Sequence, residues 1–356
     1  MNNIAVVFGG PSVEHDVSVI TGLKILKSLR RTHKLIPIYF SLEGEFFYLK
    51  DVNFSDYTNK NFLKKNGKRI EFCKGGIFLR KKNKLKRLFN IDFAINCCHG
   101  GKGESGELSA YLKMNDIRCS GGNNPICSNK FATKQFVKGL GVNCANSVLI
   151  TNSNLEQKLI EIKQNFSDNL IAKPNNLGSS IGVIKTNFKN LKDNLELLLH
   201  LDSQILVEEY IKDVEELHCA VVNNKRLLCV SEIEKILLNN DIYSFEDKYI
   251  NNLSKKEIPA NIDEKIKTTI YNWSKTIYEG LNLSGVIEFQ FFYDKQKEVL
   301  FFNEVNNVPK NLAYKMFEGL KINLKMLIDY MLNGDKGLKK QTYFESDVLS
   351  KIDLNF

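Results

Sequence analysis

The sequence lacks the segments that mark secreted and membrane proteins. No apolar run is long enough to span a bilayer, and the N-terminus has no basic segment followed by a long apolar core. Residues 4–8, Ile-Ala-Val-Val-Phe, instead have the continuous apolar character of a buried strand. We therefore expect a cytoplasmic protein without a membrane partner.

Disulfide and metal-binding patterns are missing as well. None of the eight cysteines stands in a CxxC pair, several lie in apolar runs, and the five histidines are not spaced as metal ligands. We expect the cysteines to be small buried hydrophobic residues in a reducing compartment, rather than parts of a disulfide framework or a zinc site.

Nucleic acid is not an expected partner, because the sequence has no arginine-rich arm and no array of basic and aromatic residues. The net charge of +9 favours anionic ligands in general, but lysines and acidic residues are interspersed along the chain. The composition is that of an ordinary globular protein.

The length of 356 residues is too great for one ordinary core and suits two or three α/β domains. The chain opens with a strand, the loop 9–18, a helix and a second strand, which predicts a parallel sheet. A further strand at 91–98 ends at the loop 99–106. Loops that follow parallel strands meet at one edge of the sheet, so we expect these two loops to lie together.

The rest of the chain alternates between the two types of element. Residues 46–88 predict a hairpin insertion, and the polar stretch 243–257 predicts a long loop that can act as a lid. The other predicted elements are a helix at 125–138, strands at 148–150, 170–173, 182–185, 205–211, 217–222 and 226–232, and helices at 262–281 and from 312.

Two strands joined by a polar turn are predicted between residues 286 and 306. Glu304 and Asn306 are two residues apart and face the same side of the second strand, and Glu288 and Gln290 occupy the first strand in the same way. Carboxylate and amide oxygens that converge from adjacent strands suit Mg²⁺. A hairpin with a solvated polar face accounts for the same residues.

Residues 173–183, Lys-Pro-Asn-Asn-Leu-Gly-Ser-Ser-Ile-Gly-Val, form a Gly/Ser loop between two predicted strands. Its backbone N–H groups and hydroxyls can hold phosphate, and Lys173 can add charge. The spacing is not that of a Walker A loop, and an ordinary hairpin turn fits the pattern too. Lys248 and Tyr249 fall in the predicted lid, where a lysine can close over phosphates or simply face solvent.

Seven stretches follow one another in the order FGGPSVEHDVS, HGGKGESG, SNKFATK, KPNNLGSSIGV, VEEYI, DKY and FNEVNNVP. Together they resemble the D-alanine–D-alanine ligase family of the ATP-grasp superfamily, from residue 4 to about residue 320. The resemblance implies an ATP-grasp fold of three α/β domains, at 1–120, 121–208 and 209–345, followed by a tail at 346–356. ATP would lie between the central and C-terminal domains.

The implied activity is that of an ATP-dependent ligase, which joins a carboxylate to an amine through an acyl phosphate. In this family the product is the cell-wall dipeptide D-Ala–D-Ala of peptidoglycan biosynthesis. The resemblance implies small amino-acid substrates, ATP with two Mg²⁺ ions or Mn²⁺ as an alternative, and a homodimer.

The resemblance also implies where ATP and the metal bind. The nucleotide would be held by Lys130, Lys173, Ser180, Glu208, Glu209, Ile211 and Glu216, with Lys248 reaching the γ-phosphate. Glu215 competes with Glu216 for the ribose. The metal ligands would be Glu304 and Asn306, completed by Gln290 or Glu288.

The substrate side follows from the same resemblance. Glu14, Ser179 and Tyr249 would form a hydrogen-bonded trio that links the N-terminal loop, the phosphate loop and the lid. Glu14 would receive the ammonium of the first amino acid, and His99 would lie nearby.

Five positions depart from the family pattern. Glu288 and Gln290 replace an Arg and an Asp, Lys310 replaces a Gly, and Lys315-Met316 align with a Ser-Leu pair. A carboxylate repels the oxyanion that the Arg stabilises, whereas Lys310 supplies a new cation. These changes predict an altered acceptor site. They also leave a second hypothesis open, a non-catalytic ATP-binding protein descended from such a ligase.

Overall fold

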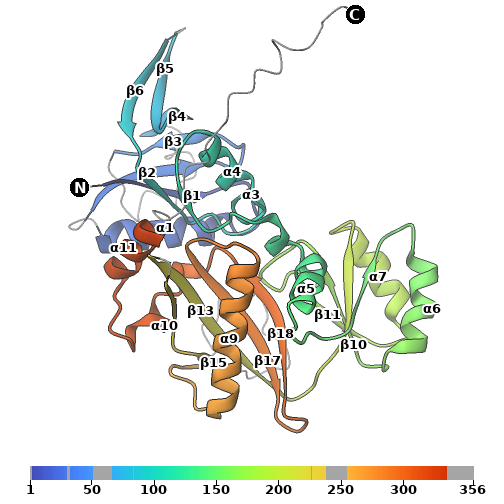
Figure 1. Ribbon diagram of the computed structural model, residues 1–356. Helices are drawn as coiled ribbons and strands as arrows, with labels where there is room; N and C mark the ends of the chain where they lie inside the picture. Colours follow the sequence, from blue (N-terminus) through green and yellow to red (C-terminus); the bar gives the residue numbers. More distant parts are fainter. Residues whose placement is uncertain are drawn as a thin grey trace, which may run out of the picture.

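The computed structural model describes residues 2–29, 33–50, 66–82, 84–225, 227–237 and 255–334. These residues form three β-sheets with helices packed against them (Figure 1). The mixed α/β class expected from the sequence is confirmed.

The first sheet has the strand order β6-β5-β4-β3-β2-β1-β7-β8. Its parallel part consists of β1 (Asn3–Gly9), β2 (Lys34–Phe40), β7 (Phe93–Asn96) and β8 (Cys119–Ser120). The predicted insertion extends this sheet by antiparallel strands, namely β3 (Phe46–Tyr48), β4 (Lys68–Cys73), β5 (Gly76–Lys81) and β6 (Lys84–Asn90).

The loops after β1 and β7 lie together, as the parallel order predicts. The hydroxyl of Ser12 donates a hydrogen bond of 2.7 Å to the carbonyl of His99, across 87 residues of sequence. Helix α1 (His15–Leu29) starts at this edge and buries Val19 and Leu23 against the sheet. The first sheet therefore places two functional loops side by side.

The second sheet is antiparallel, with the order β11-β10-β12-β9. Its strands are β9 (Ser147–Ile150), β10 (Leu170–Pro174), β11 (Ile184–Thr186) and β12 (Ile205–Glu209). Helices α6 (Leu155–Asn165) and α7 (Leu191–Leu199), which were not predicted, bury their leucine and isoleucine faces against it (Figure 1).

The third sheet has the order β16-β15-β13-β17-β18, and β14 also pairs with β13. Its strands are β13 (Val214–Asn224), β14 (Leu227–Val230), β15 (Glu234–Leu237), β16 (Lys255–Glu257), β17 (Val286–Asp294) and β18 (Val299–Asn306). Helix α9 (Glu264–Gly280) packs on one face through Ile270 and Ile277 (Figure 1). The prediction of a loop up to residue 257 was wrong for the last three residues, because β16 pairs with β15.

The remaining described helices lie between residues 101 and 139 and between residues 310 and 334. They are α3 (Gly101–Glu104), α4 (Glu107–Met114), η2 (Pro125–Ser128), α5 (Lys130–Gly139), η3 (Lys310–Ala313), α10 (Lys315–Glu318) and α11 (Leu324–Gly334). The helix predicted at 125–138 is interrupted at Asn129, whose side chain accepts a hydrogen bond of 2.8 Å from the backbone N–H of Ala132 and caps α5. The helix predicted from about residue 312 begins later, at α10, because Asn311, Leu312 and Ala313 all have positive φ.

Two further expectations concern the whole chain. Among the described helices, none combines the length and apolar composition needed to cross a bilayer. All eight cysteines lie in described ranges, none of them forms a disulfide bond, and six of them are buried. They act as small core residues, as predicted.

Candidate active site

A cavity of about 1200 Å³ brings the predicted functional loops together. Its wall includes the loop after β1 with Glu14, the loop after β7 with His99, and the loop between β10 and β11 with Ser179. The polar face of the third sheet and the turn at Lys310 complete it. Segments far apart in the sequence therefore converge on one space.

Glu14 and Ser179 are in direct contact in this cavity. The Ser179 hydroxyl donates a hydrogen bond to Oε1 of Glu14, across 165 residues of sequence. Gly178 lies against the same carboxylate, since a Cβ built there would stand 3.1 Å from Oε2 of Glu14. Two members of the expected trio thus meet. The third, Tyr249, and the lid residue Lys248 lie outside the described residues.

The two histidines of the N-terminal loops have different surroundings. His15 holds its own loop, because its Nδ1 lies 2.7 Å from the carbonyl oxygen of Gly10. His99 lines the cavity, where its Nε2 lies 3.0 Å from the hydroxyl of Thr21 and its Nδ1 lies 3.9 Å from Glu104. Burial and, less strongly, the charge of Lys310 lower the pKa of His99 to about 4, so its ring is neutral at pH 7.

Glu104 was not predicted as a site residue, although it belongs to the motif HGGKGESG. Burial raises the pKa of its carboxyl to about 8, and the nearby charges of Glu14 and Glu304 act in the same direction. A hydrogen bond from Gly100 and the charge of Lys130 oppose the rise. The cavity therefore holds a group that can carry a proton near neutral pH.

A second cavity of about 250 Å³ shares Lys130, Gln290 and Glu304 with the first. It is lined by the expected nucleotide residues Lys173, Ser180, Glu208, Glu209, Ile211 and Glu216. The sequence did not decide whether Glu215 or Glu216 would hold the ribose. Glu216 lines this cavity, whereas Glu215 pairs with Lys235 and Lys295.

The floor of this second cavity contains a buried ion triad. Glu208 is 4% exposed, and its carboxylate lies 2.6 Å from Nζ of Lys173 and 2.9 Å from Nζ of Lys134. Burial alone would raise the pKa of Glu208, but the two ammonium groups outweigh burial and lower it to about 2. Lys134 was not predicted, because as a helix residue of α5 it gives no sign of a partner on β12.

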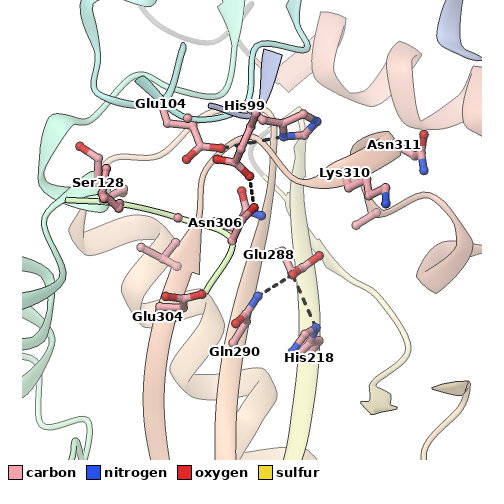
Figure 2. A pocket seen from close by; sticks show the side chains of 18 of the residues that line it. His99, Glu104, Ser128, His218, Glu288, Gln290, Glu304, Asn306, Lys310 and Asn311 are labelled. Carbon is pink, nitrogen blue, oxygen red and sulfur yellow. Dashed lines mark hydrogen bonds and ion pairs between the residues drawn. The ribbon is translucent and has the colours of Figure 1, made fainter. Parts of the chain in front are cut away.

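The hairpin β17–β18 has the register that the sequence predicts. Glu288 stands directly opposite Asn306, and Gln290 stands directly opposite Glu304. All four side chains line the large cavity (Figure 2). The alternative of a merely solvated polar face is therefore not supported.

The chemistry of these four residues fits Mg²⁺. They offer two carboxylates and two amide groups, which are the hard oxygen donors that Mg²⁺ prefers, and the phosphates of a nucleotide in the neighbouring cavity can supply more. Within the described ranges, no three His, Cys, Asp or Glu side chains are grouped to hold a metal ion by themselves. Any metal here depends on the amides and on the nucleotide.

His218 extends this polar surface across the sheet and was not predicted. It stands opposite Glu234 on one side and opposite Gln290 on the other, so Glu234, His218, Gln290 and Glu304 form one row over four adjacent strands. Its spacing of two from Glu216 was the available signal, because residues two apart in a strand share a face.

Three carboxylates surround the His218 ring. Nε2 lies 2.8 Å from Glu216, and Nδ1 lies 3.6 Å from Glu288 and 3.9 Å from Glu234. Burial alone would lower the pKa of His218, but the hydrogen bond to Glu216 and the charges of the carboxylates together raise it. The imidazolium form, which donates at both nitrogens, suits these surroundings.

Lysines cover another part of the wall of the large cavity. Lys24, Lys256, Lys310 and Lys315 line it. Partial burial, followed by the charges of Lys24 and Lys256, lowers the pKa of Lys310. The cavity therefore presents carboxylates and ammonium groups to one ligand space.

Comparisons with known proteins cover nearly the whole chain. The family described as D-ala D-ala ligase N-terminus matches residues 3–122, and that described as D-ala D-ala ligase C-terminus matches residues 136–332. The D-alanine–D-alanine ligase of Thermosipho melanesiensis is 32% identical over 372 residues, which cover 100% of this chain and 98% of the relative. The D-alanine–D-alanine ligase of Helicobacter pylori strain P12 is 29% identical and covers 95% and 96%.

Solved structures agree with this result. The VanG D-Ala:D-Ser ligase from Enterococcus faecalis has a TM-score of 0.80 at 26% identity, over 93% of this chain and 98% of that one. The fold is that of the ATP-grasp enzymes, and the chain is an ATP-dependent ligase that forms a peptide bond. More particularly, it belongs to the D-alanine–D-alanine ligase family, which confirms the resemblance carried by its motifs.

Proposed function

We propose that this ligase joins D-alanine, as the carboxylate donor, to a second amino acid whose binding half-site differs from that of its relatives. The observation that carries the proposal is the shared cavity. The Glu14–Ser179 pair lies at one part of its wall and the β17–β18 hairpin at another, where Glu288 and Lys310 replace the family residues.

The reaction has two steps. A carboxylate oxygen of the donor attacks the γ-phosphorus of ATP, the bond to ADP breaks, and an acyl phosphate forms. The acceptor ammonium loses one proton to solvent, and the resulting amine attacks the acyl carbon. The bond from the acyl carbon to the phosphate oxygen then breaks, and the departing phosphate takes the second proton from the nitrogen. Positioning and charge neutralisation supply most of the catalysis in such phosphoryl transfers.

The donor-side residues have assigned parts in this proposal. Glu14 receives the donor ammonium with His99 nearby, while Lys130, Lys173 and Ser180 contact the phosphates. Glu208, Glu209 and Ile211 hold adenine, and Glu216 holds the ribose. Lys248 and Tyr249 complete the site from the lid.

The metal in this proposal is Mg²⁺, as two ions bound with ATP, and Mn²⁺ can replace it. Glu304 and Asn306 are the main protein ligands, and Gln290 or Glu288 completes the set. Mg²⁺ neutralises phosphate charge when it is bound. We further propose a cytoplasmic homodimer, with domains at 1–120, 121–208 and 209–345 and a tail at 346–356.

The test is ADP release with pairs of D- and L-amino acids, with the product identified by mass spectrometry. We expect ADP release that requires two amino acids and yields a dipeptide beginning with D-alanine. Absence of ADP release with every pair would overturn the ligase proposal for these substrates. Retained ATP binding would then favour a non-catalytic nucleotide-binding protein, the alternative that the charge of Glu288 keeps open.

A further inference from the structure

The carboxylate of Glu288 is held from one side only. Gln290 Nε2 donates a hydrogen bond of 3.0 Å to Oε1 of Glu288, and Nδ1 of His218 lies 3.6 Å from that same oxygen. Oε2 makes no hydrogen bond or ion pair with any residue in the described part of the chain. In Figure 2 one carboxylate oxygen of Glu288 points away from both neighbours.

This arrangement leaves a fixed negative group in the cavity wall. The Glu288 side chain is 15% exposed and lines the cavity, so its second oxygen can reach a ligand. A carboxylate has about four lone-pair sites, and one hydrogen bond together with one ion pair on Oε1 does not exhaust them. The neighbouring strands β13 and β17 hold the group rigidly, because His218 and Gln290 are themselves buried.

The charges around Glu288 determine which sign of charge a ligand can carry at this place. An anionic group at this place would be repelled by Glu288 and by Glu304 on the adjacent strand, whereas a cation would be attracted. Lys310 lines the same cavity and can meet a carboxylate. An amino acid in its zwitterionic form carries both of the complementary charges.

We propose that Glu288 is a specificity-determining residue that receives the ammonium group of the acceptor amino acid. Lys310, which lines the same cavity, receives the carboxylate group of that amino acid. His218 and Gln290 act as positioning residues, since they fix Oε1 and turn Oε2 to the ligand. The proposal rests on the proposed ligase function. In this proposal the protein ligands of Mg²⁺ are Glu304, Asn306 and the side-chain carbonyl oxygen of Gln290, and Glu288 is not a metal ligand.

The experiment compares the wild type with Glu288→Gln, which removes the charge and keeps the shape. Glu298→Gln makes the same chemical change in the exposed turn of the same hairpin and serves as the matched control. The probes are D-alanine as acceptor and D-lactate, which has a hydroxyl in place of the ammonium, as substrate or competitive inhibitor. KM for ATP and the Mg²⁺ requirement are measured in parallel.

We expect Glu288→Gln to raise the acceptor KM for D-alanine about tenfold, because a charged hydrogen bond is lost. The KM or inhibition constant for D-lactate and the KM for ATP should stay within about twofold of the wild-type values. All constants of the Glu298→Gln control should do the same. Equal effects on D-alanine and D-lactate would overturn the proposal, because they would show a merely structural role. A changed Mg²⁺ requirement with an unchanged acceptor KM would overturn it too, and would make Glu288 a metal ligand.

Failure of the ligase proposal gives a different result. If the wild type releases no ADP with any amino acid, calorimetric titration of both proteins with D-alanine, in the presence of ADP and Mg²⁺, still tests Glu288. Weaker binding to Glu288→Gln supports the proposal. Equal titrations, including the absence of binding to either protein, overturn it.

Discussion

The hydroxyl of Ser179 donates a hydrogen bond to the carboxylate of Glu14, and this contact joins the loop after β1 to the loop between β10 and β11. The first loop belongs to the parallel sheet, and the second belongs to the antiparallel sheet of the expected nucleotide site. A displacement of one loop therefore changes the hydrogen bonding of the other loop. The contact provides a direct route by which the donor amino acid and the nucleotide phosphates can be aligned.

We predict that Glu14→Gln lowers kcat/KM for the donor amino acid by at least about tenfold, because Glu14 is buried and its charge is proposed to receive the donor ammonium. Ser179→Ala should have a smaller effect, since it removes one hydrogen bond but keeps the carboxylate. Steady-state kinetics at varied donor concentration measure both variants. Ser153→Ala, at an exposed position, is the control. Unchanged donor kinetics in Glu14→Gln would show that Glu14 does not contact the donor.

The second prediction concerns Glu304, which stands opposite Gln290 at the boundary of the two cavities. Glu304→Gln should raise the Mg²⁺ concentration needed for half-maximal ADP release by about tenfold or more, because it removes a charge that the ATP-bound metal needs. ADP release over a Mg²⁺ titration measures this. Glu298→Gln again serves as control, and an identical Mg²⁺ dependence in Glu304→Gln would refute the metal assignment.

A third prediction follows from the buried triad of Glu208, Lys173 and Lys134. The pKa of Glu208 is about 2 in the folded protein, against the ordinary value of 4.5. Because the folded pKa is depressed, the stabilisation is present above about pH 4.5 and is lost as the pH falls towards 2. The lowered pKa of Glu208 corresponds to roughly 3 kcal/mol of stabilisation of the folded state. Burial of Lys134, which lowers the pKa of its ammonium group, offsets a part of this stabilisation.

Glu208→Gln should therefore lower the free energy of unfolding by about 3 kcal/mol at pH 7, since it leaves a buried lysine charge without its partner. The difference from wild type should shrink to about half near pH 3. Denaturant unfolding from pH 7 to pH 3 measures it. Glu264→Gln is the matched control, because its pair with Lys267 is largely exposed and contributes little at any pH. A difference that stays constant with pH would contradict the assigned ionisation.

Strand patterns and motifs made much of this architecture predictable. The alternation in residues 286–306 predicted a hairpin, and its register placed Glu288, Gln290, Glu304 and Asn306 together as expected. The β-loop-α-β opening likewise predicted that the loops after β1 and β7 would meet. In each case a local period or a chain-order rule fixes which side chains share a face or an edge.

The residues that sequence reasoning missed depend on contacts between distant segments. Lys134 pairs with Glu208 only because α5 packs near β12, and Glu234 reaches His218 only through the short strand β15. The turn at Asn311–Ala313 has positive φ in three consecutive non-glycine residues, a conformation that Asn adopts readily but that is unusual for Leu312 and Ala313. Such features are decided by tertiary packing, and a single sequence does not carry them as a pattern.

The last prediction concerns Glu288 and Lys310 together. As a hypothesis, they mark an altered acceptor half-site, because both depart from the family pattern, have opposite charge and line one cavity. Because both side chains line one cavity, changes at the two positions should couple through the ligand that they share. Glu288→Arg with Lys310→Gly restores the family residues.

At saturating D-alanine, we expect this double variant to make D-Ala–D-Ala at least about tenfold faster than the wild type, because the restored guanidinium can stabilise the oxyanion that Glu288 repels. Its acceptor KM should rise, because Glu288 no longer receives the acceptor ammonium. Glu288→Arg alone should gain less, since Lys310 then stays in the same cavity as an additional cation that repels the new guanidinium. Rates of dipeptide formation for the wild type, both single variants and the double variant form a complete cycle. If the wild type already makes D-Ala–D-Ala as fast as the double variant, Glu288 and Lys310 do not change which acceptor amino acid the enzyme uses, and the hypothesis of an altered acceptor half-site is wrong.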